Sequence, residues 1–185
     1  MSLKSNELYR RCLSDIKVEL DEEFDKNFTR QSFMGEDDWP KRNPDLDAGR
    51  SVLTQSGALR RSVRSAMGGK AIRYHSPKPY ARIHNEGGDI TVTRKMKRYF
   101  WAKYYETAEK RTKTKKGAIG DNKRNRSLTA RAEFYRNMAL KKEGDKITIP
   151  KRQFIGGGAK VTRIIEEITT QNVEAFFKDY QFIKK

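Results

Sequence analysis

The sequence predicts an α+β fold: a small antiparallel sheet packed by long N- and C-terminal helices, with a protruding basic helical arm. Three observations predict it. Apolar residues recur at helical spacing near both ends, short segments alternate Ile or Val with Thr, and a basic stretch with two further helical patterns separates those segments. The expected order is helix, helix, strand, helix, strand, helical arm, strand, helix.

The first helix is expected over residues 6–28, where apolar side chains recur every four residues and Ser5 is available as an N-cap. Cys12 is the only cysteine, so it makes neither an internal disulfide nor a multi-cysteine metal site, and we interpret it as a small buried residue. A long polar loop follows, in which Trp39 is the one large apolar anchor. The apolar helix positions are Leu8, Cys12, Ile16, Leu20, Phe24 and Phe28.

A second helix is expected over residues 55–67, because Leu59, Val63 and Met67 are four residues apart and two glycines follow. The segment KAIRYHS then alternates as a half-exposed strand does. The segment PYARIHNEGG places a proline at its start and glycines at its end, which predicts a helix of about two turns.

The segments DITVT (89–93) and KITIP (146–150) share a pattern and are expected to pair antiparallel. Helical patterns at 94–110 and 127–142 lie between them, joined by a basic, glycine-containing tip that we expect to be mobile. We therefore predict a core domain of residues 1–93 and 146–185 with residues 94–145 as an inserted arm.

The chain ends with a strand end at QFI, a triple-glycine joint and a long helix. The expected apolar stripe of that helix is Ile164, Ile165, Ile168, Phe176, Phe177 and Tyr180.

The net charge of +17 is concentrated in the arm: residues 94–152 carry 20 basic and 6 acidic side chains. Three interpretations stay open. The arm tracks a nucleic-acid backbone while its aromatic residues stack on bases, or it has its own small core and a solvated tip, or it clasps an acidic protein neighbour. The candidate contact residues are Lys113, Lys115, Lys116, Lys123, Arg124 and Arg126.

Catalytic patterns do not appear in the sequence. The two histidines, His75 and His84, have no metal-ligand spacing, and nothing nominates a nucleophile for His84. The glycine–lysine pairs in AMGGK and GGGAK lack the other residues of a phosphate loop. We expect no enzyme, cofactor or metal, no membrane contact because no stretch has the length of a membrane span, and a reducing cytoplasm as the place of synthesis.

From Trp39 onward the sequence resembles the virion morphogenesis, or tail completion, family of tailed bacteriophages. Trp39 and Pro40, LTQSGALRRSV, YARIHNEGG and KRQFIG match the family's motifs in order, over roughly residues 24–90 and 146–180. The arm is longer than expected between the last two motifs.

The resemblance implies a non-enzymatic protein that completes the tail or joins it to the head, encoded by an active phage or a prophage. It implies copies arranged in a ring around the tail axis, contacts with other neck or tail proteins, possible DNA contact, and a place in the virion after assembly in the host cytoplasm. Docking onto an acidic protein ring is the favoured role of the arm. Gly57 and Gly87 become helix-end residues, and the packing and contact residues are Arg60, Ser62, Tyr80 and His84.

Overall fold

A computed structural model describes residues 3–41 and 51–183. The chain forms two compact units, which are described separately. Unit 1 contains residues 1–39, 51–86 and 152–185, and unit 2 contains residues 40–50 and 87–151. The predicted α+β class is confirmed, although the described strands form three separate two-stranded antiparallel ribbons and not one sheet.

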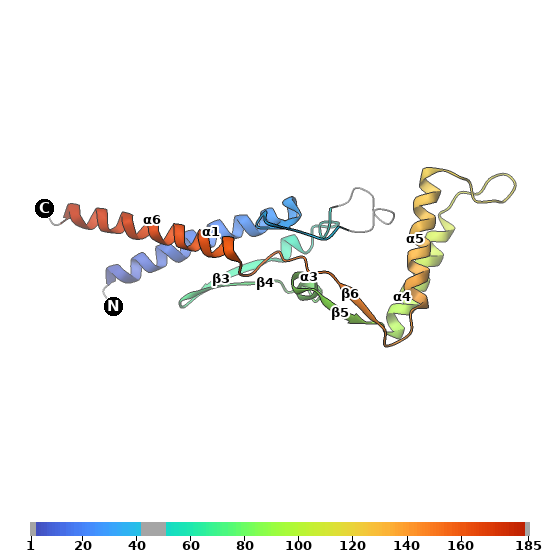
Figure 1. Cartoon of the computed structure of the whole chain (residues 1–185), viewed down its shortest axis with the longest axis horizontal. Helices are drawn as coiled ribbons and strands as arrows, with labels where there is room; N and C mark the ends of the chain where they lie inside the picture. The colour runs from blue at the N-terminus through green and yellow to red at the C-terminus, as the bar shows by residue number, and fades with distance from the viewer. Residues whose placement is uncertain (1–2, 42–50, 184–185) are drawn as a thin grey trace. The chain divides into compact units, whose positions relative to one another are not determined.

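Two long helices dominate unit 1. Helix α1 (Leu3–Arg30) and helix α6 (Ala159–Ile183) lie side by side and run in opposite directions (Figure 1). The predicted α1 stripe from Cys12 to Phe28 is buried, as expected for a helix with one apolar face. The expected cap is wrong, because Ser5 lies inside the helix and not before it. On α6, Ile164 and Ile168 pack on the core, whereas Ile165 and Phe177 are exposed.

A very short ribbon follows α1. Strands β1 (Ser32–Phe33) and β2 (Asp37–Asp38) pair antiparallel around a tight turn, and the sequence analysis did not foresee them. Trp39 follows β2 and is buried at 4% exposure, which confirms its predicted role as the anchor of this polar segment. Part of the predicted long loop, residues 42–50, lies outside the described residues.

The predicted helix over 55–67 is wrong. A single 3₁₀ turn, η1 (Arg60–Ser62), leads into strand β3 (Arg64–Gly68), which pairs antiparallel with β4 (Ala71–His75). A two-residue turn joins the strands, and Gly69 adopts φ +59° at its first position, a conformation that favours glycine. Leu59 is buried and Val63 packs against the same apolar cluster, but Met67 is 51% exposed, so the spacing marks two core positions without forming a helix.

Helix α3 (Ala81–Glu86) matches the predicted short helix. Gly87 ends it at φ +74°, and a Cβ atom there would lie 2.9 Å from the backbone nitrogen of Lys151. The expectation that a side chain at Gly87 would intrude is therefore confirmed.

Unit 2 is built on a ribbon and a helical hairpin. Strands β5 (Gly88–Thr91) and β6 (Lys146–Ile149) pair antiparallel, which confirms the predicted ribbon. Between them, α4 (Arg94–Glu109) and α5 (Lys123–Leu140) pack side by side (Figure 1). Both arm helices were predicted, but α5 begins four residues earlier than expected. The predicted division into a core of residues 1–93 and 146–185 and an inserted arm of residues 94–145 stays a prediction.

Phe154 lies at the centre of the apolar packing in unit 1. Its side chain is 0% exposed, its ring centroid lies 5.3 Å from that of Phe28, and Phe28 in turn meets the Trp39 ring edge-on at 5.6 Å. Leu59 and Ala81 complete this cluster. The predicted strand at residues 153–155 is wrong, because this extended segment pairs with no strand.

Replacing Phe154 with alanine is expected to lower the free energy of unfolding by about 3–5 kcal/mol, because it leaves a cavity in fully buried packing. Chemical denaturation followed by circular dichroism measures the loss. Phe177→Ala is the matched control, since Phe177 is 56% exposed on α6. Equal losses in the two variants would contradict the central place given to Phe154.

Candidate functional site

The motif residues converge on one extended segment that runs from Arg152 to Ile155. The side-chain oxygen of Asn85 accepts hydrogen bonds from the backbone N–H groups of Phe154, at 2.9 Å, and Ile155, at 3.1 Å. The N–H of Arg152 donates to the carbonyl of His84 at 2.8 Å. The end of α3 therefore supplies the acceptors that a neighbouring strand would otherwise provide.

The carbonyl groups of the same segment are bound from other elements. Asn27 Nδ2 donates to the carbonyl of Phe154 at 3.1 Å, and Trp39 Nε1 donates to that of Gln153 at 2.8 Å. The side-chain oxygen of Asn27 also accepts from the N–H of Met34 at 2.7 Å. Asn27 is 0% exposed and hydrogen-bonded through both ends of its amide, as a buried polar side chain requires.

The other motif side chains also bind the scaffold. Arg60 forms a two-point salt bridge with Asp25 of α1, and its Nε lies 2.6 Å from Asp25 Oδ1. Hydrogen bonding to Arg60 lowers the pKa of Asp25. The hydroxyl of Ser62 donates to the carbonyl of Leu59 at 2.7 Å and lies 2.7 Å from the hydroxyl of Ser76. Arg60 and Ser62 are thus paired with neighbours that hold η1 in place.

Burial likewise accounts for Cys12. Desolvation is the main cause that raises the pKa of its thiol, which agrees with the predicted small buried residue. Within the described residues, no group of three or more His, Cys, Asp and Glu side chains is arranged to hold a metal ion. None of the helices in the described part of the chain is long and apolar enough to cross a membrane.

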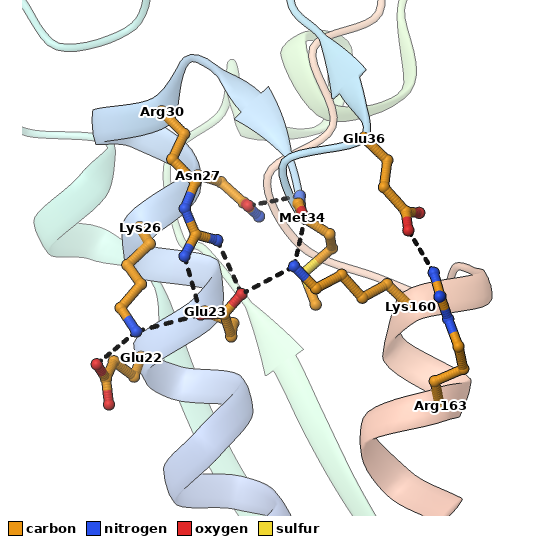
Figure 2. Close-up of polar contacts among 9 residues, drawn as sticks. All are labelled: Glu22, Glu23, Lys26, Asn27, Arg30, Met34, Glu36, Lys160 and Arg163. Atoms are coloured by element: carbon orange, nitrogen blue, oxygen red, sulfur yellow. Dashed lines mark hydrogen bonds and ion pairs between the residues drawn. The ribbon is translucent and has the colours of Figure 1, made fainter.

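A charged cluster around Glu23 connects the end of α1 to the start of α6 (Figure 2). Glu23 has an 8% exposed side chain and lies 2.8 Å from Arg30, 3.2 Å from Lys26 and 3.7 Å from Lys160. Lys160 also donates to the carbonyl of Met34 at 2.8 Å. Hydrogen bonding to Arg30, opposed by burial and aided by Lys26, lowers the pKa of Glu23 to about 2. The cluster neutralises a buried carboxylate, so we assign it a structural role.

The two arm helices of unit 2 bury small and aromatic residues against each other. Ala132 and Ala139 of α5 are almost fully buried, Thr107 of α4 is also buried, and the rings of Phe100 and Tyr135 stack at 6.3 Å. These contacts show that part of the arm's apolar surface forms its own small core.

The tip between the helices is organised by Asn125, which is 2% exposed. Its amide nitrogen donates to the carbonyls of Thr112, at 2.9 Å, and Gly120, at 2.6 Å, and its oxygen accepts from the N–H of Thr112 at 3.0 Å. Asn122 caps α5 by accepting from the N–H of Asn125 at 2.8 Å. One buried asparagine therefore holds together the start of the tip, at Thr112, and its end, at Gly120.

The six candidate contact residues fall into two groups. The first group, Lys113, Lys115 and Lys116, is exposed on the tip as predicted. The second group lies on the first turns of α5 and not on a loop, which corrects the prediction, because the Asn122 cap starts the helix earlier. Within this group Arg126 pairs with Asp121 at 2.6 Å. The second group consists of Lys123, Arg124 and Arg126.

Both arm helices begin with basic residues and have no acidic residue in the first turn. The N-terminal end of a helix carries a partial positive charge, so cations there are repelled and anions are favoured. Lys123 and Arg124 stand at the start of α5, and Arg94 and Lys95 at the start of α4. An anionic partner would relieve this repulsion.

The asparagines that carry these networks do not stand out in the sequence. Asn27, Asn85 and Asn125 each satisfy backbone groups of a distant or adjacent loop. For Asn27 a signal was available, since a polar residue beside Phe28 on an apolar helix face has to be paired. For Asn85 and Asn125 the partners are defined only by the tertiary structure.

The comparison with protein-family models agrees with this reading of the motifs. The model of the phage virion morphogenesis family matches residues 7–174. The chain therefore belongs to the phage virion morphogenesis family, whose members take part in phage assembly. The search of curated proteins and the search of solved structures gave no match.

Glu23→Gln is expected to destabilise the protein at pH 6 by about 2 kcal/mol and to lose that effect at low pH. The pKa of Glu23 is lowered from 4.5 to about 2 in the folded state, so its stabilisation is complete above pH 4.5 and disappears as the pH falls toward 2. Denaturation of both proteins at several pH values measures the difference.

Glu22→Gln is the control, because the Glu22 side chain is 59% exposed and pairs with Lys26 at the surface. Its effect is expected to be small across the range. A pH-independent loss in Glu23→Gln would contradict the pairing described for Glu23.

Proposed function

We propose that this protein is a non-enzymatic structural component that completes the phage tail or joins the tail to the head. The observation that carries the proposal is the family match over residues 7–174. The motif side chains support it, because Asn85, Arg60 and Ser62 bind backbone groups or neighbouring side chains of the scaffold.

We further propose that the protein acts as a ring of copies in the virion, assembled in the host cytoplasm, and that the arm tip docks on an acidic surface of another neck or tail protein. The exposed lysines of the tip and the basic first turns of α4 and α5 support an anionic partner. We expect the exposed, charged tip of the α4–α5 hairpin to become more ordered when it binds its partner during assembly.

Deletion of the gene in an inducible phage tests the role in assembly. The expected result is free filled heads together with unjoined or incomplete tails in electron micrographs, and recovery when the wild-type gene is supplied in trans. Normal tailed particles after deletion would refute the proposal.

A variant with all six candidate contact residues changed to glutamine, supplied in trans, tests whether assembly needs the basic side chains of the arm as well as the folded protein. This variant keeps the buried contacts of Asn125 and is expected to fold but to restore few joined particles. The matched control replaces six exposed basic residues of unit 1 and is expected to restore assembly. The neutralised residues are Lys113, Lys115, Lys116, Lys123, Arg124 and Arg126.

A nucleic-acid-binding accessory protein is the alternative, favoured by the +14 net charge of residues 94–152. It requires duplex or single-stranded DNA affinity that persists at physiological salt, has a steep salt slope, and is lost in the six-residue glutamine variant. Fluorescence anisotropy at several salt concentrations measures this. Binding confined to low salt is the result that the assembly proposal predicts.

A further inference from the structure

The side of α4 that faces away from α5 is a surface with no partner in the described chain. Arg94, Arg98, Trp101 and Tyr105 recur at spacings of three and four, so they share one helix face, which we call the α4 outer face. The rings of Trp101 and Tyr105 stack at 6.0 Å, and Tyr105 is 58% exposed. Among the described residues, Arg94 and Arg98 form no salt bridge and no side-chain hydrogen bond.

This composition is typical of the centre of a protein interface. Trp, Tyr and Arg are the residues most enriched among those that dominate binding energy. Tyr105 is exposed and Trp101 is half-buried, so their stacked rings leave apolar surface in contact with solvent on this face. The α4 outer face therefore fits a protein surface that is apolar along its centre and acidic at its edges.

Unit 1 has a groove between α1 and α6 in which apolar and acidic side chains lie together with neutral polar ones. A groove of about 510 Å³ is lined on α1 by Asp15, Val18 and Glu19, with Arg11 at one end. Val18 is 64% exposed although it is apolar. We call this the α1–α6 groove.

The α6 side of the groove is lined by Ile168, Gln171, Asn172 and Ala175, and the buried Asn172 side chain donates to Asp15 across the groove at 2.9 Å. Glu167 and Glu174 lie one turn to either side of Gln171 along α6. Between residues 164 and 177, α6 has three acidic and no basic side chains. Like Glu19, both Glu167 and Glu174 form no ion pair with the described residues.

We propose that the α4 outer face of one copy docks in the α1–α6 groove of a second copy, with Trp101 and Tyr105 against the apolar lining residues Val18, Ile168 and Ala175 and with Arg94 and Arg98 beside the unpaired carboxylates. The contact is heterologous, so each copy has one face and one groove to offer, and repetition builds a ring if the rotation closes. It deepens the proposed assembly role, on which it rests, and leaves the tip lysines for another virion protein.

The opposite charges of the α4 outer face and the α1–α6 groove favour a second copy of the protein over DNA as the binding partner. Residues 94–126 have a net charge of +10, and the groove edges carry unpaired carboxylates, so both surfaces lack counterions within their own unit. A strand of DNA would satisfy the arginines but would leave the acidic groove and the exposed Val18 without a partner.

Charge reversal tests the contact in the full-length protein. Arg94→Glu with Arg98→Glu reverses the α4 outer face, and Glu19→Lys with Glu167→Lys reverses the groove. Sedimentation velocity is expected to show association of the wild-type protein and weakening by roughly tenfold or more for each variant alone. An equal mixture of the two variants is expected to regain association, because each reversed surface then meets an opposite charge.

Lys113→Glu with Lys115→Glu is the matched control, since it changes the net charge by the same amount on the tip. It is expected to associate like the wild type. Circular dichroism checks that all variants fold, as expected for changes at exposed positions.

Three results would overturn the proposal. The first is a wild-type protein that stays monomeric at its highest soluble concentration, and the second is a mixture of the two charge-reversal variants that associates no better than either variant alone. The third is a tip variant that loses association as much as the charge-reversal variants do. Loss of DNA binding without any change in association in the α4 variant would assign this face to nucleic acid instead. The proposed assembly role is tested separately by gene deletion, which can succeed or fail whatever the sedimentation result.

Discussion

The packing of unit 1 depends on how the backbone of residues 152–155 is hydrogen-bonded. This segment is neither helix nor strand, so strand pairing does not satisfy its polar groups. Side chains of Asn27, Trp39 and Asn85 do so instead. A buried peptide group without a partner costs about 1–3 kcal/mol, so these side chains fix where α1, α3 and the start of α6 meet.

This constraint also explains the polar residues that recur in the sequence motifs. The arginine, serine and asparagine positions bind scaffold groups: Arg60 holds η1 on α1 through Asp25, and Ser62 joins η1 to Ser76 after β4. The surfaces proposed for partner contacts lie elsewhere, at the basic tip, on the outer face of α4 and in the groove between α1 and α6. The chain belongs to the phage virion morphogenesis family.

Much of the fold could be predicted from the sequence. The stripe of α1, the buried Trp39, the β5–β6 ribbon and both arm helices follow from local periodicity and turn residues, which the tertiary structure did not override. The six candidate contact residues were chosen from charge alone, and their role stays a prediction; the cap at Asn122 places three of them on a helix.

The failures have a common physical cause. The spacing of Leu59, Val63 and Met67 fits a helix, but β4 supplies hydrogen bonds to this segment and the turn at Gly69 joins the two strands. The strand expected near Phe154 failed because its partners are side chains from distant parts of the chain. Sequence patterns reflect local conformational preference, and they do not show which asparagine side chain will hydrogen-bond to which distant peptide group.

Hydrogen exchange at single-amide resolution tests the central claim most directly. If side chains hold the segment as described, the amide protons of Phe154 and Ile155 exchange as slowly as those in the middle of α1, through global unfolding only. Exchange of these two amides at the rate of exposed loop residues would contradict the account, because the segment would then open without disturbing the rest of unit 1.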